Sequence, residues 1–192
     1  MSVMAVIAEP SLEANLTAGR LRCPVCYGPL SRWGFARERT VRLLDRSRQL
    51  RPRRAWCAPC EQTHVLLPAW AVTRRRDGTE VIGRVLLTNA NGWGHRRIAA
   101  ELGRPAGTVR GWLRAFARRA EAVTSCARRW ELAAGGSGDR GIVSGSPLVQ
   151  ALDALGRATR ACRLRLDVSA SPWELAVALG LLDGRPRDPP GF

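Results

Sequence analysis

The stretch His95–Arg114 has the sequence HRRIAAELGRPAGTVRGWLR and decides the fold that we predict for the middle of the chain. Ile98 and Leu102 recur at helical spacing, which predicts the inner face of a first helix. Gly103 follows directly, where the end of a helix favours a residue that can adopt a positive φ. Pro105 stands where the first turn of a second helix does not need its N–H. The stretch therefore predicts two short helices around a tight turn.

The second helix, residues 106–120, has an apolar face and a basic face. Its apolar stripe consists of Val109, Trp112, Leu113 and Phe116. The spacing of this stripe from Gly103 is typical of a helix-turn-helix. The opposite face carries a row of three arginines, namely Arg110, Arg114 and Arg118. A solvated face usually mixes charges of both signs. This row of one sign therefore indicates that the helix binds an anionic ligand, and it disfavours an ordinary helical hairpin without a ligand.

A helix before this motif completes a three-helix unit. Asp77 and Glu80 form a capping-box-like start, and Val81 and Val85 belong to its apolar face. No helix breaker occurs between Ala117 and Ala134, so the second motif helix either runs on through this stretch or breaks once. We therefore predict a helix-turn-helix domain over residues 77–134 with an extended third helix.

Two Cys-x-x-Cys pairs, Cys23/Cys26 and Cys57/Cys60, are separated by 30 residues. Two residues between cysteines let both sulfurs point into one tight turn, and two such turns supply the four thiolates of a tetrahedral Zn²⁺ site. We expect Thr40–Leu44 and Arg53–Cys57 as short strands, with Asp45–Pro52 as the turn between them. This pattern predicts one structural Zn²⁺ in a zinc ribbon over residues 21–72.

Two other uses of these four cysteines fit the sequence less well than zinc binding does. A redox Cys-x-x-Cys needs only one pair and a βαβ context, and an iron–sulfur centre is less consistent with the even spacing. His64 is able to replace one cysteine as a ligand, but packing or hydrogen bonding beside the site is the favoured interpretation. Cys126 and Cys162 have no partner at ligand spacing and are expected to be small core residues.

The composition is strongly basic. All 31 basic residues are arginine and the formal net charge is +15. The excess lies almost entirely between Arg20 and Gly135, because residues 136–192 hold seven arginines and six acids. A GC-rich genome explains arginine in place of lysine, but it does not explain the missing acids. The distribution predicts a polyanionic partner.

Several function classes are disfavoured by what the sequence lacks. There is no lysine for a phosphate-binding glycine loop, and the two histidines form no visible nucleophile–base arrangement. The scattered acids of the tail show no strand pattern, so we expect no catalytic residues and no enzyme.

No apolar run is long enough to cross a bilayer, and the N-terminus is a poor signal peptide. We expect a cytoplasmic, nucleoid-associated protein with no membrane partner.

The remaining segments complete the predicted organisation. Residues 1–20 are expected to be a loose arm, residues 135–145 a flexible Gly/Ser linker, and residues 185–192 a disordered tail. Residues 146–184 predict two helices that begin at Ser146-Pro147 and at the capping box Ser171–Glu174. The predicted fold class is thus mainly α with a small β zinc ribbon, a three-helix helix-turn-helix domain and a small C-terminal helical region.

The segments CPVC, CAPC, THVLLPAW and GWGHRRIAAELGRPAGTVRGWLR carry a resemblance to a known group of proteins. In this order they resemble the uncharacterised, transposase-like zinc-ribbon plus helix-turn-helix proteins of high-GC bacteria. They are also similar to the N-terminal DNA-binding part of insertion-sequence transposases. The resemblance covers roughly residues 21–123 and implies DNA binding, with the four cysteines as ligands. The catalytic domain of those transposases is absent, which argues against strand transfer.

We therefore expect a sequence-specific binder of double-stranded DNA, either a transcription regulator or a mobile-element accessory factor. The expected DNA contacts are Arg96, Arg97, Thr108, Arg110, Arg114 and Arg118. The first two are expected to contact phosphates, as the zinc ribbon also does, and helix 106–120 to enter the major groove. The C-terminal helices are candidates for a homodimer or partner-protein interface. The alternatives are an RNA-binding or ribosome-associated zinc module and a DNA-anchored interaction adaptor.

Overall fold

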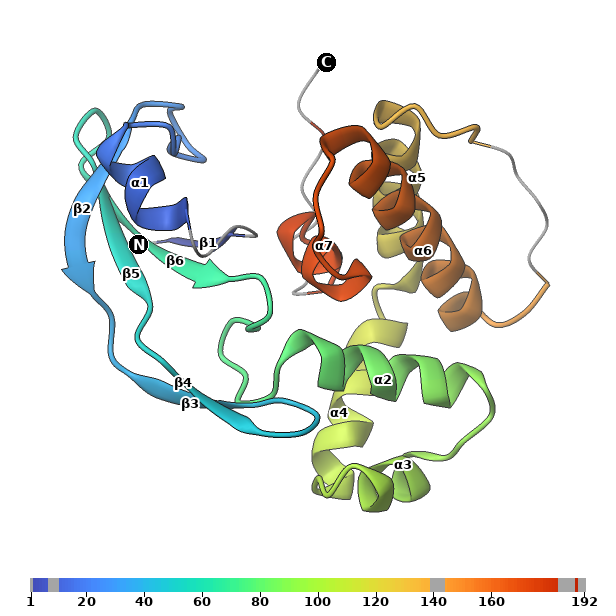
Figure 1. Cartoon of the computed structure of the whole chain (residues 1–192). Coiled ribbons are helices and arrows are strands. Elements are labelled where there is room, and N and C mark those ends of the chain that lie inside the picture. The colour runs from blue at the N-terminus through green and yellow to red at the C-terminus, as the bar shows by residue number, and fades with distance from the viewer. Residues whose placement is uncertain (1, 7–10, 139–143, 183–188, 190–192) are drawn as a thin grey trace. The chain divides into compact units, whose positions relative to one another are not determined.

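The computed structural model describes residues 2–6, 11–138, 144–182 and 189 (Figure 1). The chain divides into two units, Met1–Gly78 and Thr79–Phe192. None of the described helices has the length and apolar character needed to cross a membrane. Most of the predicted tail, residues 185–192, and the middle of the predicted linker, residues 139–143, lie outside the described residues.

Unit 1, Met1–Gly78, is built mainly from strands. Its elements are β1 (Ser2–Val6), α1 (Leu12–Thr17), β2 (Leu30–Phe35), β3 (Arg39–Arg42), β4 (Ser47–Leu50), β5 (Arg53–Cys57) and β6 (Gln62–Pro68). Four strands form a mixed sheet in the order β1-β6-β5-β2, with β1 parallel to β6 and the other neighbours antiparallel. Strands β3 and β4 pair separately as an antiparallel hairpin.

Two predictions for this region are wrong. Residues 1–20 were expected to be a loose arm, but Ser2–Val6 pairs with β6 from Ser2 opposite His64 to Val6 opposite Pro68. The expected turn Asp45–Pro52 contains a strand, because Ser47–Leu50 pairs with β3. A single strand cannot satisfy its own backbone N–H and C=O groups. Strand β6, distant in the chain, supplies hydrogen-bond partners to β1, and the neighbouring strand β3 supplies them to β4.

Side chains point alternately to the two faces of each strand, and those on the inner face form the core of unit 1. Ala55 and Cys57 of β5 are buried, as is Leu30 at the start of β2, and they pack with Leu16 of α1. A second cluster, of Val41, Leu50, Leu67 and Ala71, joins the hairpin to the end of β6. The first cluster contains Cys23 and Cys57, so the cysteines are part of the core and not an addition to it.

Unit 2, Thr79–Phe192, is helical in its described part. It contains α2 (Thr79–Ala90), α3 (His95–Glu101), α4 (Ala106–Ala117), α5 (Ala120–Ala133), α6 (Pro147–Leu166) and α7 (Pro172–Ala178). The inner faces predicted for the first three helices are confirmed at Val85, Ile98, Val109 and Trp112, which are at most 4% exposed. Gly103, between α3 and α4, has a φ of +60° as the turn requires. Cys126 and Cys162 are buried core residues, also as predicted.

The C-terminal helices belong to the same core as α2. Trp173 of α7 lies so close to Gly83 of α2 that a Cβ there would be 2.1 Å from the indole ring. The predicted capping box is confirmed, because Ser171 accepts a hydrogen bond from the N–H of Glu174 and donates its own N–H to the Glu174 carboxylate. The Ser171 hydroxyl also donates to Glu80 in the first turn of α2. Helix α7 is thereby tied to the start of unit 2.

The predicted fold class is wrong. Helix accounts for 46% of the structure and strand for 20%, so the chain is a mixed α and β protein and not a mainly helical one with a small ribbon. A separate three-helix helix-turn-helix domain is also not what the structure contains, because α2 to α7 form one unit. Sequence periodicity identifies the buried face of each helix but not the partner that covers it, and α2 is covered partly by Trp173.

The extended third helix breaks once, which is one of the two alternatives that the sequence left open. Helix α4 ends at Ala117, and α5 begins at Ala120 after a break at Arg118 and Arg119. Arg119 has a φ of −118° and ψ of 6°, which is not helical. The break allows α5 to change direction and pack along α6. A buried Glu131 of α5 there binds Arg157 of α6 with an N–O distance of 3.3 Å.

Candidate functional site

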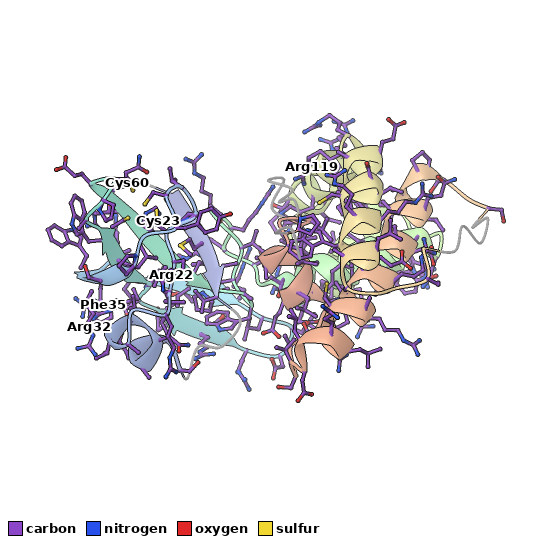
Figure 2. All side chains as sticks on the ribbon, turned by 90° about the horizontal axis from the view of Figure 1, so that it is seen from above. Arg22, Cys23, Arg32, Phe35, Cys60 and Arg119 are labelled. Carbon is purple, nitrogen blue, oxygen red and sulfur yellow. The ribbon has the colours of Figure 1, made fainter. Side chains whose placement is uncertain are left out.

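The four cysteines of the two Cys-x-x-Cys pairs converge at one end of the sheet of unit 1. Cys23 and Cys26 lie in the loop before β2, Cys57 ends β5, and Cys60 lies in the turn to β6. Their sulfurs all lie within 4.8 Å of one another. The Sγ atoms of Cys23 and Cys60 are 3.6 Å apart, and those of Cys26 and Cys57 are 3.3 Å apart. Figure 2 shows the sulfurs of Cys23 and Cys60 side by side.

The two Cys-x-x-Cys turns share one backbone feature. The residue after the second cysteine has a left-handed conformation in each, with φ of 58° at Tyr27 and 50° at Glu61. In the first turn the N–H of Val25 points at the Cys23 sulfur, with an N–S distance of 3.4 Å. The Tyr27 N–H closes the turn on the Cys23 carbonyl at 3.0 Å. Two similar turns therefore present backbone N–H groups and thiols to a common centre.

The spacing of the sulfurs fits a tetrahedral metal ion. Four sulfurs at about 2.3 Å from a common centre are separated from one another by about 3.8 Å, close to the 3.6 Å between Cys23 and Cys60 and the 3.3 Å between Cys26 and Cys57. Those separations are far longer than the roughly 2.05 Å of a disulfide bond, and all four cysteines are free thiols. The four cysteines thus lie at metal-binding distance.

His64 supports this cluster from β6. Its side chain is fully buried, and its Nε2 lies 3.4 Å from the Cys23 sulfur. The set of side chains at metal-ligand distance contains the four cysteines and not His64. The favoured prediction of a hydrogen bond beside the site is confirmed. An imidazole N–H in this position stabilises negative charge on the Cys23 sulfur.

The thiols differ in their acidity. Burial raises the pKa of a thiol, yet the pKa of Cys23 falls to about 6 because the N–H groups of Cys26 and Val25 and two neighbouring thiols donate hydrogen bonds to its sulfur. Burial, together with the hydrogen bonds to the other three thiols, raises the pKa of Cys60 to about 12. The pKa of Cys57 is also raised, mainly by burial. Cys57 and Cys60 therefore hold protons at neutral pH that a metal ion has to displace.

The predicted DNA-contacting residues lie on α3, α4 and the residue that follows α4. Arg110, Arg114 and Arg118 are exposed, and Thr108 is half-buried. No acidic residue occurs in α4, and within the described part of the chain no ion pair involves these three arginines. A Cβ at Gly107 or Gly111 would meet no atom within 4 Å, so the surface between the arginines is open. The structure brings together the row that the sequence predicted on α4.

Arg96 and Arg97 are exposed at the start of α3. The guanidinium of Arg97 lies 3.5 Å from the centre of the Trp93 ring, a cation–π contact that the sequence pattern did not identify. Arg119, in the break between α4 and α5, donates from Nε to the carbonyl of Ala115 in α4 at 2.9 Å.

Unit 1 carries a stacked aromatic pair that is partly exposed. Trp33 of β2 is 53% exposed and stacks on Trp56 of β5, with 5.1 Å between the ring centres and 27° between the planes. Phe35, also exposed, has the guanidinium groups of Arg51 and Arg53 at 4.9 and 4.5 Å from its ring. The exposure of Trp33 and Phe35 shows that these two rings are not part of the core of unit 1.

No family model, no curated protein and no solved structure matches this chain. The resemblance to zinc-ribbon plus helix-turn-helix proteins therefore remains a prediction from the motifs, and the geometry of the cysteines and arginines carries the functional argument.

Proposed function

We propose that this protein binds double-stranded DNA through the exposed face of α4 and that one Zn²⁺ on the four cysteines stabilises unit 1. The observation that carries the first part is the row of exposed arginines on an acid-free helix face. Guanidinium groups without internal partners attract phosphates, and Arg suits the O6 and N7 acceptors of guanine. The open surface at Gly107 and Gly111 permits close approach of a DNA groove.

The arginines have different roles in this proposal. Arg110 and Arg114 lie one helical turn apart and reach base edges, with Thr108 beside them. Arg118 and the pair Arg96 and Arg97 contact phosphates. Trp93 holds the guanidinium of Arg97 in place through their ring contact. The protein then acts as a sequence-specific regulator or as an accessory factor of a mobile element.

Zinc is the metal that best suits the four thiols. Four cysteine ligands in a tetrahedral arrangement are typical of a structural zinc site that leaves no position for substrate. A site with four thiolates carries a net charge of −2, and the His64 ring is placed to donate a hydrogen bond to the Cys23 sulfur. Mass spectrometry under native conditions tests this directly, because we expect one zinc per chain and none after Cys57→Ser.

A second candidate function is binding of single-stranded RNA by unit 1. It is favoured by the exposed Trp33, which stacks on the half-buried Trp56, since unpaired bases stack on aromatic rings presented by a sheet. The favoured proposal remains duplex DNA, because the arginine row on α4 requires no strand separation.

Selection from a random duplex pool at moderate salt tests the proposal. We expect an enriched sequence motif, and we expect Arg110→Ala to weaken binding to that motif by about 1–3 kcal/mol while relaxing base preference. Arg128→Ala on α5 is the matched control, because it removes one exposed arginine from the same unit. Tighter binding of unstructured RNA than of any selected duplex, lost on Trp33→Ala, would replace the DNA proposal by the second candidate.

A further inference from the structure

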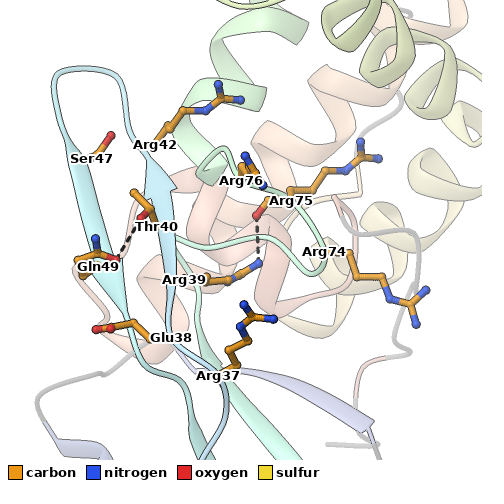
Figure 3. Close-up of a pocket in the computed structure, with 10 residues that line it drawn as sticks. All are labelled: Arg37, Glu38, Arg39, Thr40, Arg42, Ser47, Gln49, Arg74, Arg75 and Arg76. Atoms are coloured by element: carbon orange, nitrogen blue, oxygen red, sulfur yellow. Dashed lines mark hydrogen bonds between the residues drawn. The ribbon is translucent and has the colours of Figure 1, made fainter.

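Unit 1 contains a cavity of about 850 Å³ between the β3–β4 hairpin and the segment 74–76 (Figure 3). Ten residues line it, and six of them are arginines: Arg37, Arg39, Arg42, Arg74, Arg75 and Arg76. The single acidic lining residue is Glu38, whose carboxylate points away from the guanidinium groups of Arg37 and Arg39 in Figure 3. The α4 proposal makes no use of this cavity.

Two of the arginines hold the walls of the cavity together. Arg39 donates from Nη1 to the carbonyl of Arg75 at 3.0 Å and from Nη2 to that of Val72 at 3.2 Å. The backbone N–H of Arg42 donates to the Arg76 carbonyl at 2.6 Å. The Arg42 side chain binds the buried carboxylate of Asp77, also at 2.6 Å. The segment 72–77 is thereby fixed along the edge of β3.

Gly78 makes this close approach possible. Its N–H donates to the Arg42 carbonyl at 2.9 Å. A Cβ at this position would lie 2.7 Å from the Leu43 side chain and 3.0 Å from the Trp70 carbonyl oxygen. The arrangement is therefore specified by the sequence on both sides of the cavity and does not depend on the exposed arginines themselves.

The positive charge in the cavity is largely uncompensated. Asp77 neutralises Arg42, whereas the carbonyl partners of Arg39 carry no charge. Within the described part of unit 1, no hydrogen bond or ion pair involves the guanidinium groups of the other four lining arginines. The Nε atoms of Arg39 and Arg42 are buried and have no hydrogen-bond partner among the described residues. Burial also lowers the pKa of Arg39, which shows that its charge is poorly solvated.

We propose that this cavity is a binding site for clustered phosphate groups, held by Arg37, Arg74, Arg75 and Arg76. Guanidinium groups bind phosphate oxygens in pairs of parallel hydrogen bonds, and several guanidinium groups around one cavity match a ligand that carries several phosphates. The volume exceeds what a single phosphate needs and is in the range of sites for nucleotide-sized ligands. The site goes beyond the α4 proposal, because it lies in unit 1 and needs no duplex groove.

Inorganic tripolyphosphate is the probe for this site, titrated calorimetrically into the full chain at low salt. The test variant is Arg37→Gln/Arg76→Gln, which removes two exposed side chains with no internal partners. We expect it to weaken tripolyphosphate binding by about tenfold or more. The control is Arg20→Gln/Arg46→Gln, which removes the same charge from exposed positions of unit 1 outside the cavity. It should change the affinity by less than about twofold.

A further variant and a second ligand complete the test. Arg74→Asn suits the φ of 58° at that position and should weaken tripolyphosphate binding without loss of folding. A short duplex and a single-stranded oligonucleotide identify the source of the phosphates. If the test variant weakens them as well, and tripolyphosphate displaces them, the ligand is a nucleic-acid backbone. If only tripolyphosphate binding falls, it is a free phosphorylated molecule.

Equal losses in the test and control variants, or unchanged binding in both cavity variants, would overturn the proposal. This result is distinguishable from failure of the α4 proposal. Arg110→Ala leaves the cavity intact and should not affect tripolyphosphate binding, whatever it does to duplex DNA.

Discussion

Replacement of Gly83 by alanine tests the packing that makes α2 and α7 part of one unit. The added Cβ would lie 2.1 Å from Cε2, 2.2 Å from Cδ2 and 2.5 Å from Nε1 of Trp173. Non-bonded carbon atoms require about 3.5–4.0 Å, so the indole has to move by roughly 1.5 Å. Small adjustments are restricted, because Trp173 is only 9% exposed and the capping box of Ser171 holds the first turn of α7.

The expected cost follows from these constraints. Overpacking costs about 1–3 kcal/mol, and complete loss of a buried tryptophan from its site costs about 3–5 kcal/mol. The higher helix propensity of alanine returns about 1 kcal/mol. Because the required movement is too large for a rotamer adjustment, we expect Gly83→Ala to lower the free energy of unfolding by about 2–4 kcal/mol.

Urea unfolding followed by circular dichroism at 222 nm measures this effect in the helical unit. Gly156→Ala on α6 is the matched control, since a Cβ there meets no atom within 4 Å; it should stabilise by about 0.5–1 kcal/mol. In a Trp173→Leu background the cost of Gly83→Ala should largely disappear. A Gly83→Ala protein as stable as the parent, or equally destabilised in both backgrounds, would refute the contact.

The metal site and α4 lead to three further predictions. His64→Leu removes the ring that lies 3.4 Å from the Cys23 sulfur and should weaken zinc binding about 10- to 100-fold in competition with a chelator, without changing the stoichiometry; an unchanged affinity would contradict its role. Since burial raises the pKa of Cys57 and Cys60, each of these thiols releases a proton on binding. These two protons alone should lower the apparent zinc affinity by about two log units per unit decrease in pH near neutrality. An affinity independent of pH would show that these thiols are already ionised. Arg96→Ala should reduce the salt dependence of DNA binding by about one unit of log–log slope and weaken all sequences alike, whereas loss of base preference would place it at a base edge.

Local features of this protein were determined by the sequence alone. Each Cys-x-x-Cys turn, the capping box at Ser171, the turn at Gly103 and the arginine row of α4 depend on residues within about one or two turns of chain. Their backbone geometry follows from short-range hydrogen bonds and steric preferences, so the residue types and spacing were sufficient to predict them. The convergence of the two cysteine pairs was also predictable, because four thiols at this spacing share one chemical use.

Long-range pairing was decided only by the tertiary structure. Strand β1 pairs with β6 across about sixty residues, and nothing in its short apolar run specifies that partner. Gly83 and Trp173 likewise lie on helices that the sequence suggested were in separate domains. The arginine cavity arises because Arg39 fixes a segment more than thirty residues away along the edge of β3. Periodicity shows which face of an element is buried. The element that covers this face is determined by the shape and volume of side chains that are distant in the chain and that meet only in the folded molecule.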